Sequence, residues 1–362
     1  MFILIPYLIL IISFAFVWYK EKSVKTESIE VIETISVIIA FRNESKNLHN
    51  LINSLLGQEK VQNFEIIFVN DHSTDNSVEI IEMYKNHSFI KLLNLPENLQ
   101  GKKQALLYAS KQAKGNILFF TDADCVLPKF WLNTMYNYMS KKNLQMLCAA
   151  VEFIEEKGIL NKIFQLEFLS MTGSGAAGFF LKKPFICNGA NYAIKKEIFE
   201  EASKFFNLKY SSGDDVFLLH YVSKHYKVGF IKSEQTIVKT KAPQNIKQFF
   251  SQRIRWASKT SGYKNFMTIF SIIINFLYSF SLFFFLFLSI FNYKFLFVIL
   301  TFFILKFFVD LIFMLAVLKF YKKQKLIIYF PIVQLFYPFY IISIGILSQT
   351  ITPIWKERLI KY

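Results

Sequence analysis

The sequence predicts an α/β domain with a mainly parallel, Rossmann-like sheet, joined to transmembrane helices. Between residues 33 and 241, short β-branched runs alternate with polar helical stretches, as in strands joined by crossover helices. Few polar residues interrupt the strand runs, which is typical of a sheet covered on both faces. Beyond residue 265 the chain consists mainly of long apolar runs rich in phenylalanine.

The composition indicates an integral membrane protein with one sizeable soluble domain. Of the 362 residues, 53% are hydrophobic and 18% aromatic, which is too apolar for a soluble chain of this length. The basic residues behind the net charge of +16 are spread through the soluble part and flank the apolar runs. This pattern favours anionic headgroups and a phosphorylated substrate, and argues against nucleic acid as a partner. The three cysteines and five histidines lack the spacing of a zinc site.

Five short apolar runs are predicted to be strands of the sheet: 35–40, 65–69, 90–93, 117–121 and 146–151. Helices are predicted at 45–56, opened by an Asn43-Glu44-Ser45 capping signal, and at 102–113, ended by Gly115. Ligands of parallel sheets bind beyond the carboxyl ends of the strands. The acidic residues that follow 65–69 and 117–121 are therefore expected at one edge of the sheet.

The first apolar run, residues 2–19, is predicted to be a membrane anchor. Its length is close to the roughly 17 to 25 residues that a spanning helix needs. It lacks the basic stretch and the small-residue cleavage site of a secretory signal. Trp18, Tyr19 and Lys20 resemble an interfacial belt with retained positive charge, which places the following domain in the cytoplasm. The protein is expected in the inner or plasma membrane of the cell.

Three further apolar runs follow the soluble domain. Residues 266–291 and 295–318 are predicted to form a helical hairpin, and the lysines after it return the chain to the cytoplasm. The last run, 326–348, is interrupted by Pro331 and Pro338, so it either spans the membrane or makes a re-entrant or interfacial passage. The sequence therefore predicts three or four spans.

Two charged residues interrupt the run 295–318. Lys306 and Asp310 are four residues apart on a predicted helix. Each would cost on the order of 3 kcal/mol within a membrane, so such residues are rarely idle. We predict that they pair with each other and face protein; contact with an acceptor is the alternative.

These segments divide the chain into five predicted parts, and no internal repeat or low-complexity linker divides the soluble domain further. They are an N-terminal transmembrane anchor (1–20), the α/β domain (30–243), an amphipathic interface helix (244–264), a C-terminal transmembrane region of two or three helices (265–350) and a basic tail (351–362).

An acidic pair at a strand end is the candidate metal site. Asp122 and Asp124 follow the strand 117–121 and are separated by one residue, so a tight turn would point both to one side. Hard oxygen ligands suit Mg²⁺ or Mn²⁺. Such an ion would neutralise a diphosphate leaving group as its bond to a sugar breaks. The alternative for an isolated Asp-Xaa-Asp is a solvated turn.

Two other segments suit a nucleotide diphosphate. Asp71 ends the strand 65–69 and can accept a hydrogen bond from a base N–H, whereas Ser73 and Asp75 are expected to cap the next helix. Lys102 and Lys103 open a helix, where a diphosphate would meet two ammonium groups and the positive helix end. A solvated basic turn explains the lysines equally well.

A second acidic pair, Asp214 and Asp215, opens the predicted helix 216–222. The pair is either a helix cap with a favourable dipole interaction or a general base, because two adjacent carboxylates raise the pKa of one member. The residues alone favour neither interpretation.

The pentad QRIRW, residues 252–256, lies in a basic amphipathic stretch that is predicted to rest on the membrane surface. Gln252, Arg255 and Trp256 share one helical face and can converge on one ligand. Arginine suits a diphosphate and tryptophan offers an apolar face to a sugar ring. The alternative, a membrane-anchoring Trp with a headgroup-binding Arg, leaves the glutamine unexplained.

The order of these motifs resembles the processive and lipid-linked members of glycosyltransferase family 2, which have a GT-A fold. The matching stretches cover essentially the whole soluble domain. They are SVIIAFRNE (36–44), EIIFVNDHSTDNS (65–77), the segment around Lys102 and Lys103, TDADC (121–125), NGANYAIKKE (188–197), SGDDVFLLH (212–220) and QRIRW.

The resemblance implies a metal-dependent, inverting hexosyltransferase that uses a UDP-sugar. It implies that Asp215 is the general base, beside Asp214 in place of the commoner glutamate, and that Asp122 and Asp124 serve the ribose-diphosphate and metal. The residues that it assigns to nucleotide or donor binding are Ala40, Arg42, Glu44, Asp71, Lys102, Lys103, Asp122, Gly189, Ala190, Asn191, Gln252, Arg255 and Trp256.

The number of predicted spans bears on the acceptor. Polymer synthases that thread their product usually need more helices than three or four, unless an accessory membrane subunit supplies them. The sequence therefore favours transfer onto a membrane lipid or lipid-linked acceptor, as in ceramide glucosyltransferase-like relatives. The alternatives are a polysaccharide synthase subunit of the poly-N-acetylglucosamine, hyaluronan or cellulose type, acting on a glycan, and an inactive scaffold that binds nucleotide-sugar or lipid.

Overall fold

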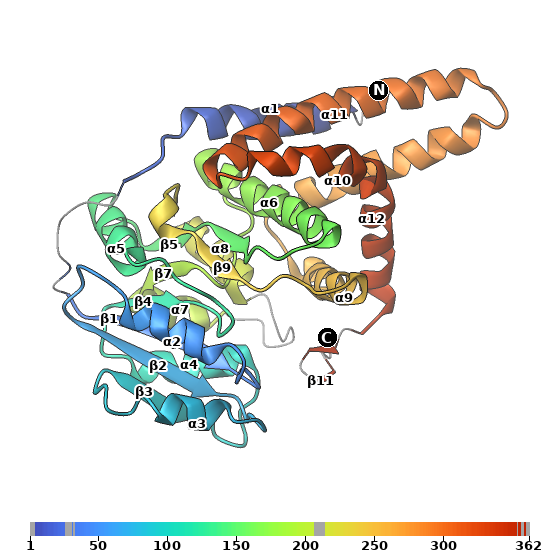
Figure 1. Ribbon diagram of the computed structural model, residues 1–362. Helices are drawn as coiled ribbons and strands as arrows, with labels where there is room; N and C mark the ends of the chain where they lie inside the picture. Colours follow the sequence, from blue (N-terminus) through green and yellow to red (C-terminus); the bar gives the residue numbers. More distant parts are fainter. Residues whose placement is uncertain are drawn as a thin grey trace. The chain divides into compact units, whose positions relative to one another are not determined.

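The computed structural model describes residues 4–25, 31, 33–205, 214–352, 354–355 and 358–359, and the chain forms two compact units (Figure 1). The sheet unit comprises Ser23–Ile154, Ile186–Lys241 and Trp355–Tyr362. The helical unit comprises Met1–Lys22, Glu155–Phe185 and Ala242–Ile354. The sequence did not indicate that residues 155–185 pack with the N- and C-terminal helices.

The core of the sheet unit is a seven-stranded sheet in the order β3-β2-β1-β4-β7-β5-β8. Its strands are β1 (Ile35–Phe41), β2 (Phe64–Asn70), β3 (Ile90–Asn94), β4 (Ile117–Phe120), β5 (Met146–Ala149), β7 (Tyr192–Lys195) and β8 (Val228–Ile231). All neighbours pair in parallel except β7, which is antiparallel to both β4 and β5. The predicted α/β class with a mainly parallel sheet is confirmed, and β7, β8 and β9 are strands that the sequence analysis did not identify.

The predicted strand 146–151 is divided between two sheets. β5 stays in the main sheet, whereas β6 (Val151–Phe153) pairs in parallel with β9 (Val238–Thr240). The amide nitrogen of the fully buried Asn191 donates to the carbonyl of Ala150, at the corner between β5 and β6, over 2.7 Å. The same carbonyl also accepts from the backbone N–H of Val238 at 3.0 Å, so the side-chain bond adds to a backbone bond where the strand changes sheets.

Helices surround this sheet. They are α2 (Leu48–Leu56), α3 (Ser77–Glu82), α4 (Lys102–Gln112), α5 (Trp131–Lys141), α7 (Lys196–Ser203), α8 (Asp214–His225) and the short η1 (Glu234–Thr236). The predicted capping signal at residues 43–45 was wrong: α2 begins only at Leu48, and its cap residue Asn47 makes no side-chain capping bond. Helix α4 ends at Gln112, before Gly115, because Ala113 is already extended.

The helical unit contains the apolar helices and α9. Its elements are α1 (Leu4–Lys20), α6 (Ile159–Phe180), α9 (Ile246–Ala257), η2 (Thr260–Gly262), α10 (Phe266–Leu288), α11 (Lys294–Phe320), η3 (Gln324–Tyr329) and α12 (Phe330–Thr350). Two further short strands, β10 (Ile354–Trp355) and β11 (Arg358–Leu359), pair with each other near the chain end. The other residues of the predicted basic tail, 353, 356–357 and 360–362, lie outside the described residues.

Within the described part of the chain, three helices are long and apolar enough to cross a membrane: Phe266–Leu288, Lys294–Phe320 and the continuous segment Gln324–Thr350. α1 is an apolar helix of 17 residues. In the last segment Pro331 lies in the first turn of α12, where proline is tolerated, and Pro338 lies inside the helix.

Helices α1 and α11 pack side by side and run in the same direction. The rings of Phe14 and Phe313 lie 6.1 Å apart and those of Trp18 and Phe320 5.6 Å apart. The indole nitrogen of Trp18 also donates to the carbonyl of Gly173 in α6 at 2.8 Å. A Cβ on Gly173 would lie only 2.7 Å from the Val317 side chain, so glycine permits the close approach of α6 and α11.

A buried polar cluster joins α1, α11 and α12. As predicted, Lys306 pairs with Asp310, and Lys306 is 1% exposed. The Tyr7 hydroxyl donates to the same carboxylate at 2.7 Å, and the Gln334 amide donates to it at 3.0 Å. Both charges of this cluster therefore have partners.

Candidate active site

The carboxyl ends of three parallel strands meet at one edge of the sheet. In β1, Phe41 lies opposite Asn70 of β2, and Ile38 lies opposite Phe120 of β4. In the antiparallel β7, Tyr192 also lies opposite Phe120. The segments that follow β1, β2 and β4, and the segment that precedes β7, therefore share this edge.

Three of the predicted site residues are linked at this edge. Asp71 is 2% exposed, and its Oδ1 accepts from the backbone N–H of Gly101 at 3.1 Å. The next residue, Lys102, places its ammonium group 2.5 Å from Oδ1 of Asp122. Gly101 has a φ of 90°, a conformation that residues with side chains rarely adopt, so glycine lets α4 begin against Asp71. The structure thus brings Asp71, Lys102 and Asp122 together.

Lys103 has different surroundings from its neighbour. It is 4% exposed, and its ammonium nitrogen lies 5.4 Å from the centre of the Phe217 ring in α8. The two lysines that were both predicted to meet a diphosphate therefore differ, with Lys102 next to a carboxylate and Lys103 against an aromatic ring.

Hydrogen bonds join the loop that follows β1 to the loop that follows β2. The Arg42 guanidinium donates to the carbonyls of Asp71 at 2.9 Å and His72 at 2.8 Å. In return the backbone N–H of Asn43 donates to the Ser73 hydroxyl at 3.1 Å. Asn43 and His72 both have positive φ, at 52° and 55°, which non-glycine residues rarely adopt. Arg42 therefore supports the backbone that carries Asp71.

Asp75 stabilises the same pair of loops. It accepts hydrogen bonds from the backbone N–H of Ser45 at 3.0 Å and of Ser77 at 3.1 Å. Burial raises the pKa of Asp75, but the hydrogen bonds from Ser77 and Ser45 outweigh it and lower the pKa overall. These contacts support a structural role, including the predicted contribution to the start of α3.

Asp124 lies where negative charge accumulates. Its Oδ2 accepts from the Thr240 hydroxyl of β9 at 3.1 Å. Burial, followed by the charges of Asp122 and Glu44, raises the pKa of Asp124 to about 6. The carboxylates of Asp122, Asp124 and Glu44 therefore repel one another electrostatically, and a bound cation would relieve that repulsion.

These residues fit a divalent cation that also binds substrate. Among the described residues, no cluster of three or more His, Cys, Asp and Glu side chains could hold a metal ion by itself. Mg²⁺ and Mn²⁺ sites at phosphates commonly use one or two carboxylates, with water and phosphate oxygens as the other ligands. Asp122 and Asp124 provide the hard oxygen ligands for such a site.

Asp215 lies at the start of α8, beside the segment that precedes β7. Its Oδ1 accepts from the backbone N–H of the next residue, Val216, at 2.8 Å. A Cβ added to Gly189 would lie 3.1 Å from Oδ2 of Asp215, so the absence of a side chain at Gly189 keeps this oxygen approachable. Residues 211–213 and the side chain of Asp214 lie outside the described residues.

Ala190 and Asn191 follow Gly189 directly before β7, and both are buried. The Asn191 amide donates to Ala150 and to the carbonyl of Thr236, each at 2.7 Å, and its oxygen accepts from the Trp131 indole at 2.9 Å. Ala190 is 2% exposed. The polar atoms of Asn191 are therefore bonded to the protein itself, whereas Gly189 lies next to the Asp215 carboxylate.

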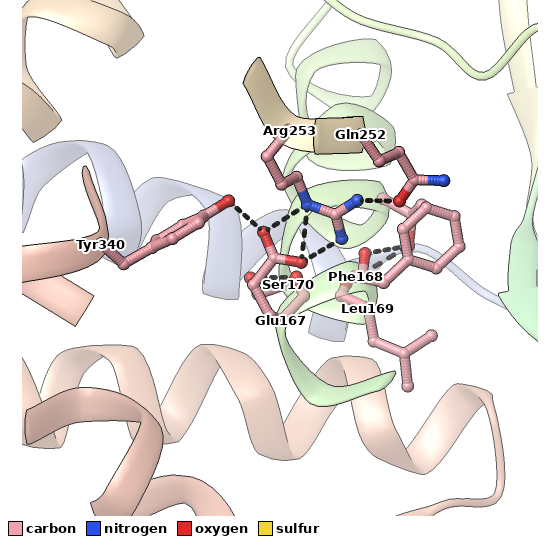
Figure 2. Close-up of polar contacts among 8 residues, drawn as sticks. Glu167, Phe168, Leu169, Ser170, Gln252, Arg253 and Tyr340 are labelled. Carbon is pink, nitrogen blue, oxygen red and sulfur yellow. Dashed lines mark hydrogen bonds and ion pairs between the residues drawn. The ribbon is translucent and has the colours of Figure 1, made fainter. Parts of the chain in front are cut away.

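The predicted residues of the pentad lie on α9, in the helical unit. Gln252, Arg255 and Trp256 are all half-buried. Between them Arg253 is 3% exposed, and Figure 2 shows it bonded to both Glu167 and Gln252. The guanidinium carbon also lies 4.5 Å from the centre of the Trp256 ring. The structure therefore adds Arg253 and Glu167 to the residues around this pentad.

Residues 36–202 match the family described as glycosyl transferase family 2. Over these residues the chain resembles family 2 glycosyltransferases. This confirms the predicted resemblance, and the match ends before α8 and α9, so it does not include Asp215 or the pentad.

Curated relatives resemble part of this chain. The chain is 29% identical over 131 residues to the poly(ribitol-phosphate) β-N-acetylglucosaminyltransferase TarS of Staphylococcus aureus strain Mu50, covering 36% of this chain and 23% of TarS. It is 33% identical over 171 residues to the poly-β-1,6-N-acetyl-D-glucosamine synthase of Staphylococcus epidermidis, covering 44% of this chain and 40% of the synthase. The matches thus span less than half the length of either relative.

A solved glycosyltransferase shares the fold. The mannosyltransferase PcManGT of Pyrobaculum calidifontis, in complex with GDP-mannose and Mn²⁺, superposes with a TM-score of 0.52 and 19% identity over 67% of this chain and 66% of that chain. Together with the mainly parallel sheet, this confirms the predicted GT-A fold.

Proposed function

We propose that this glycosyltransferase is inverting and transfers an N-acetylglucosamine-type sugar from a UDP-sugar to a membrane lipid or lipid-linked acceptor. The observation that carries the proposal is the assembly of Asp71, Lys102, Asp122 and Asp124 at one sheet edge. The sugar is suggested by the two curated relatives, whose names both include N-acetylglucosamine.

The donor is proposed to lie along this edge. Asp71 would accept from the base, and Lys102 would meet the diphosphate beside Asp122. The structural neighbour was captured with a guanine nucleotide, and guanine also offers N–H donors, so a donor screen must include GDP-sugars. The other residues proposed to contribute to donor binding are Ala40, Arg42, Glu44, Lys103, Gly189, Ala190, Asn191, Gln252, Arg255 and Trp256.

Asp122 and Asp124 are the proposed ligands of a Mg²⁺ or Mn²⁺ ion. When bound, the ion would neutralise the negative charge of the departing diphosphate. Lys102 adds a positive charge at the same place, since its ammonium group already contacts Asp122. The sheet edge would thus stabilise the leaving group with fixed charges.

Asp215 is proposed to take the proton from the acceptor hydroxyl. Its Oδ1 accepts from the backbone N–H of Val216, and the lack of a side chain at Gly189 leaves room for an acceptor hydroxyl beside Oδ2. The hydroxyl that loses its proton would then attack the sugar carbon from the side opposite the nucleotide, which inverts its configuration.

The base can be tested by replacing Asp215 with Asn. General acid–base catalysis contributes roughly 10²- to 10⁴-fold, so sugar transfer should fall by at least 10²-fold while UDP still binds in the presence of Mn²⁺. Transfer would be followed by UDP release, and binding by calorimetry on the purified membrane protein. Full turnover by the variant would exclude Asp215 as the base.

A processive synthase is the second candidate function. It is favoured by the 33% identity to a poly-N-acetylglucosamine synthase, whereas the three candidate spans favour a single transfer. Membranes supplied with radiolabelled UDP-N-acetylglucosamine would give a lipid-soluble monoglycoside in the first case and an ethanol-insoluble polymer in the second. UDP release with neither product, or with no donor at all, would support hydrolysis or an inactive scaffold instead.

We further propose that the sheet unit faces the cytoplasm, where nucleotide-sugars are made. The three helices that could cross a membrane support membrane association, and an accessory membrane subunit would be needed only for a processive product. Protease protection of the sheet unit in sealed inside-out and right-side-out vesicles would test this orientation.

A further inference from the structure

A buried ion pair joins α9 to α6 inside the helical unit. The Arg253 side chain donates from Nε to the Glu167 carboxylate oxygens at 3.1 and 3.2 Å, and from Nη2 to Oε2 (Figure 2). Side-chain exposures of 3% for Arg253 and 10% for Glu167 show that water hardly reaches the pair. The Tyr340 hydroxyl of α12 donates to Oε1 of Glu167 at 2.8 Å. This Glu167–Arg253–Tyr340 cluster therefore ties α9 to two other helices.

Arg253 also contacts the first residue of the pentad. Its Nη1 donates to Oε1 of Gln252 at 2.5 Å. A guanidinium group has only donors, so Gln252 must turn its oxygen toward Arg253. The amide nitrogen of Gln252 then points away from the guanidinium, as Figure 2 shows. The amide orientation therefore follows from the donor-only guanidinium as well as from the observed contact.

The consequence concerns what Gln252 can bind. A free glutamine side chain can present either an acceptor or a donor, because its amide can rotate by half a turn. With Arg253 in place it presents two N–H donors on the half-buried side of α9. Arg255, three residues after Gln252 in α9, is a donor-only side chain. The face that carries Gln252 and Arg255 is therefore set up for an acceptor-rich ligand, and a diphosphate is such a ligand.

We propose that Arg253, held by Glu167 and Tyr340, is a positioning residue that converts Gln252 into a hydrogen-bond donor for the diphosphate of the nucleotide-sugar. The inference rests on the proposed function, since it assumes a diphosphate donor. Arg253 itself does not contact the donor, because its nitrogen atoms are directed at Glu167 and Gln252 in the buried cluster. Its stacking on Trp256 fixes the neighbouring indole in the same way.

The test must separate positioning from stability. Removing Arg253 alone would leave a buried, unpaired Glu167 and destabilise the unit. The triple variant Glu167→Leu, Arg253→Met and Tyr340→Phe removes all three polar partners together, so it leaves no orphaned buried group. Replacing a buried ion pair by apolar residues of similar volume is often neutral for stability.

We expect the triple variant to raise the donor KM about tenfold, with kcat within about threefold and a thermal unfolding midpoint close to that of the unsubstituted protein. Gln252→Ala should raise the donor KM by a similar factor. Adding the triple substitution to Gln252→Ala should then raise it no further, because Arg253 acts through Gln252. Arg253→Lys, which keeps a donor next to Gln252 and a charge next to Glu167, should retain most of the donor affinity.

A matched control removes the other buried pair of the helical unit. Lys306→Met with Asp310→Leu does not touch α9 and should leave the donor KM unchanged. An unchanged KM in the triple variant would overturn the inference, as would an equal rise in KM in the presence and absence of Gln252. Absence of UDP release from any UDP-sugar by the unsubstituted protein would instead refute the proposed function. A normal donor KM in Gln252→Ala would refute the inference and leave the transferase function standing.

Discussion

The two units differ in how their buried carboxylates are compensated. At the edge of the sheet unit a carboxylate has other acidic groups as neighbours, whereas inside the helical unit it has a basic partner. Asp124 has Asp122 and Glu44 as acidic neighbours, and burial together with these charges raises its pKa to about 6. Glu167 instead meets Arg253 in a bidentate pair and accepts a third hydrogen bond from Tyr340. Excess negative charge can be relieved by a bound cation, whereas a matched pair can only hold the fold or orient a neighbour.

The largest expected effect is the loss of activity on replacing Asp124 with Asn. Turnover should fall about 10³-fold, equivalent to about 4 kcal/mol of transition-state stabilisation, because a metal ligand is lost. The metal-free variant should be at least as stable as the unsubstituted protein, since one repelling charge is gone. UDP release at saturating donor and Mn²⁺, together with thermal unfolding, would measure both effects.

Thr240→Val is the control for that substitution, because it removes a hydrogen bond to Asp124 and keeps the carboxylate. Its turnover should stay within about tenfold of normal, as one neutral hydrogen bond contributes about 1 kcal/mol. If Asp124→Asn kept full turnover, the excess charge at the sheet edge would have no part in catalysis and the contrast between the two regions would fail.

An intermediate effect is expected on stability in the helical unit. Lys306→Met leaves the buried Asp310 unpaired and should lower the free energy of unfolding by about 3 kcal/mol. The double variant with Asp310→Leu should recover most of this loss. Chemical unfolding in detergent would compare the two variants. Equal destabilisation by both would show that the ion pair itself stabilises the unit, beyond cancelling two buried charges.

The smallest effect is a pH dependence of the metal-free protein. The folded pKa of Asp124, about 6, lies above its ordinary value of 3.8. Between these values the unfolded chain has lost the proton and the folded protein has kept it, so stability falls as pH rises from about 4 to about 6 and changes little above that. Two pKa units correspond to about 3 kcal/mol, which partial exposure of Asp124 reduces to about 1 to 2 kcal/mol.

Thermal unfolding in a chelating buffer between pH 4 and 8 would measure this slope, with Asp124→Asn as the reference. The difference between the two proteins should decrease as pH falls through about 6. A slope of the opposite sign would mean that Asp124 is stabilised as a carboxylate by a positive neighbour, and that its surroundings resemble those of Glu167.

The sequence predicted the sheet unit better than the helical unit. Strands β1 to β4 were predicted within one residue or so at each end, because uninterrupted apolar runs bounded by polar turns are a strong local signal. The acidic residues after β2 and β4 followed from the rule for parallel sheets. By contrast, the antiparallel strand β7 depends on pairing between distant segments, for which its four residues carry no signal.

The polar contacts of the helical unit were missed for a related reason. Glu167 lies in an apolar segment between Leu166 and Phe168, and Arg253 lies on the apolar face of α9 with Phe249. A lone carboxylate in such a helix must find a partner, so its presence was a usable signal. The identity of the partner, 86 residues away, required the folded structure.

The parallel packing of α1 and α11 fixes their relative orientation, which hydropathy alone does not give. If both helices cross a bilayer, the helix ends at residues 4 and 294 must face the same aqueous compartment, since the two helices run in the same direction. A thiol reagent that cannot permeate the bilayer would then label cysteines introduced at both positions or at neither.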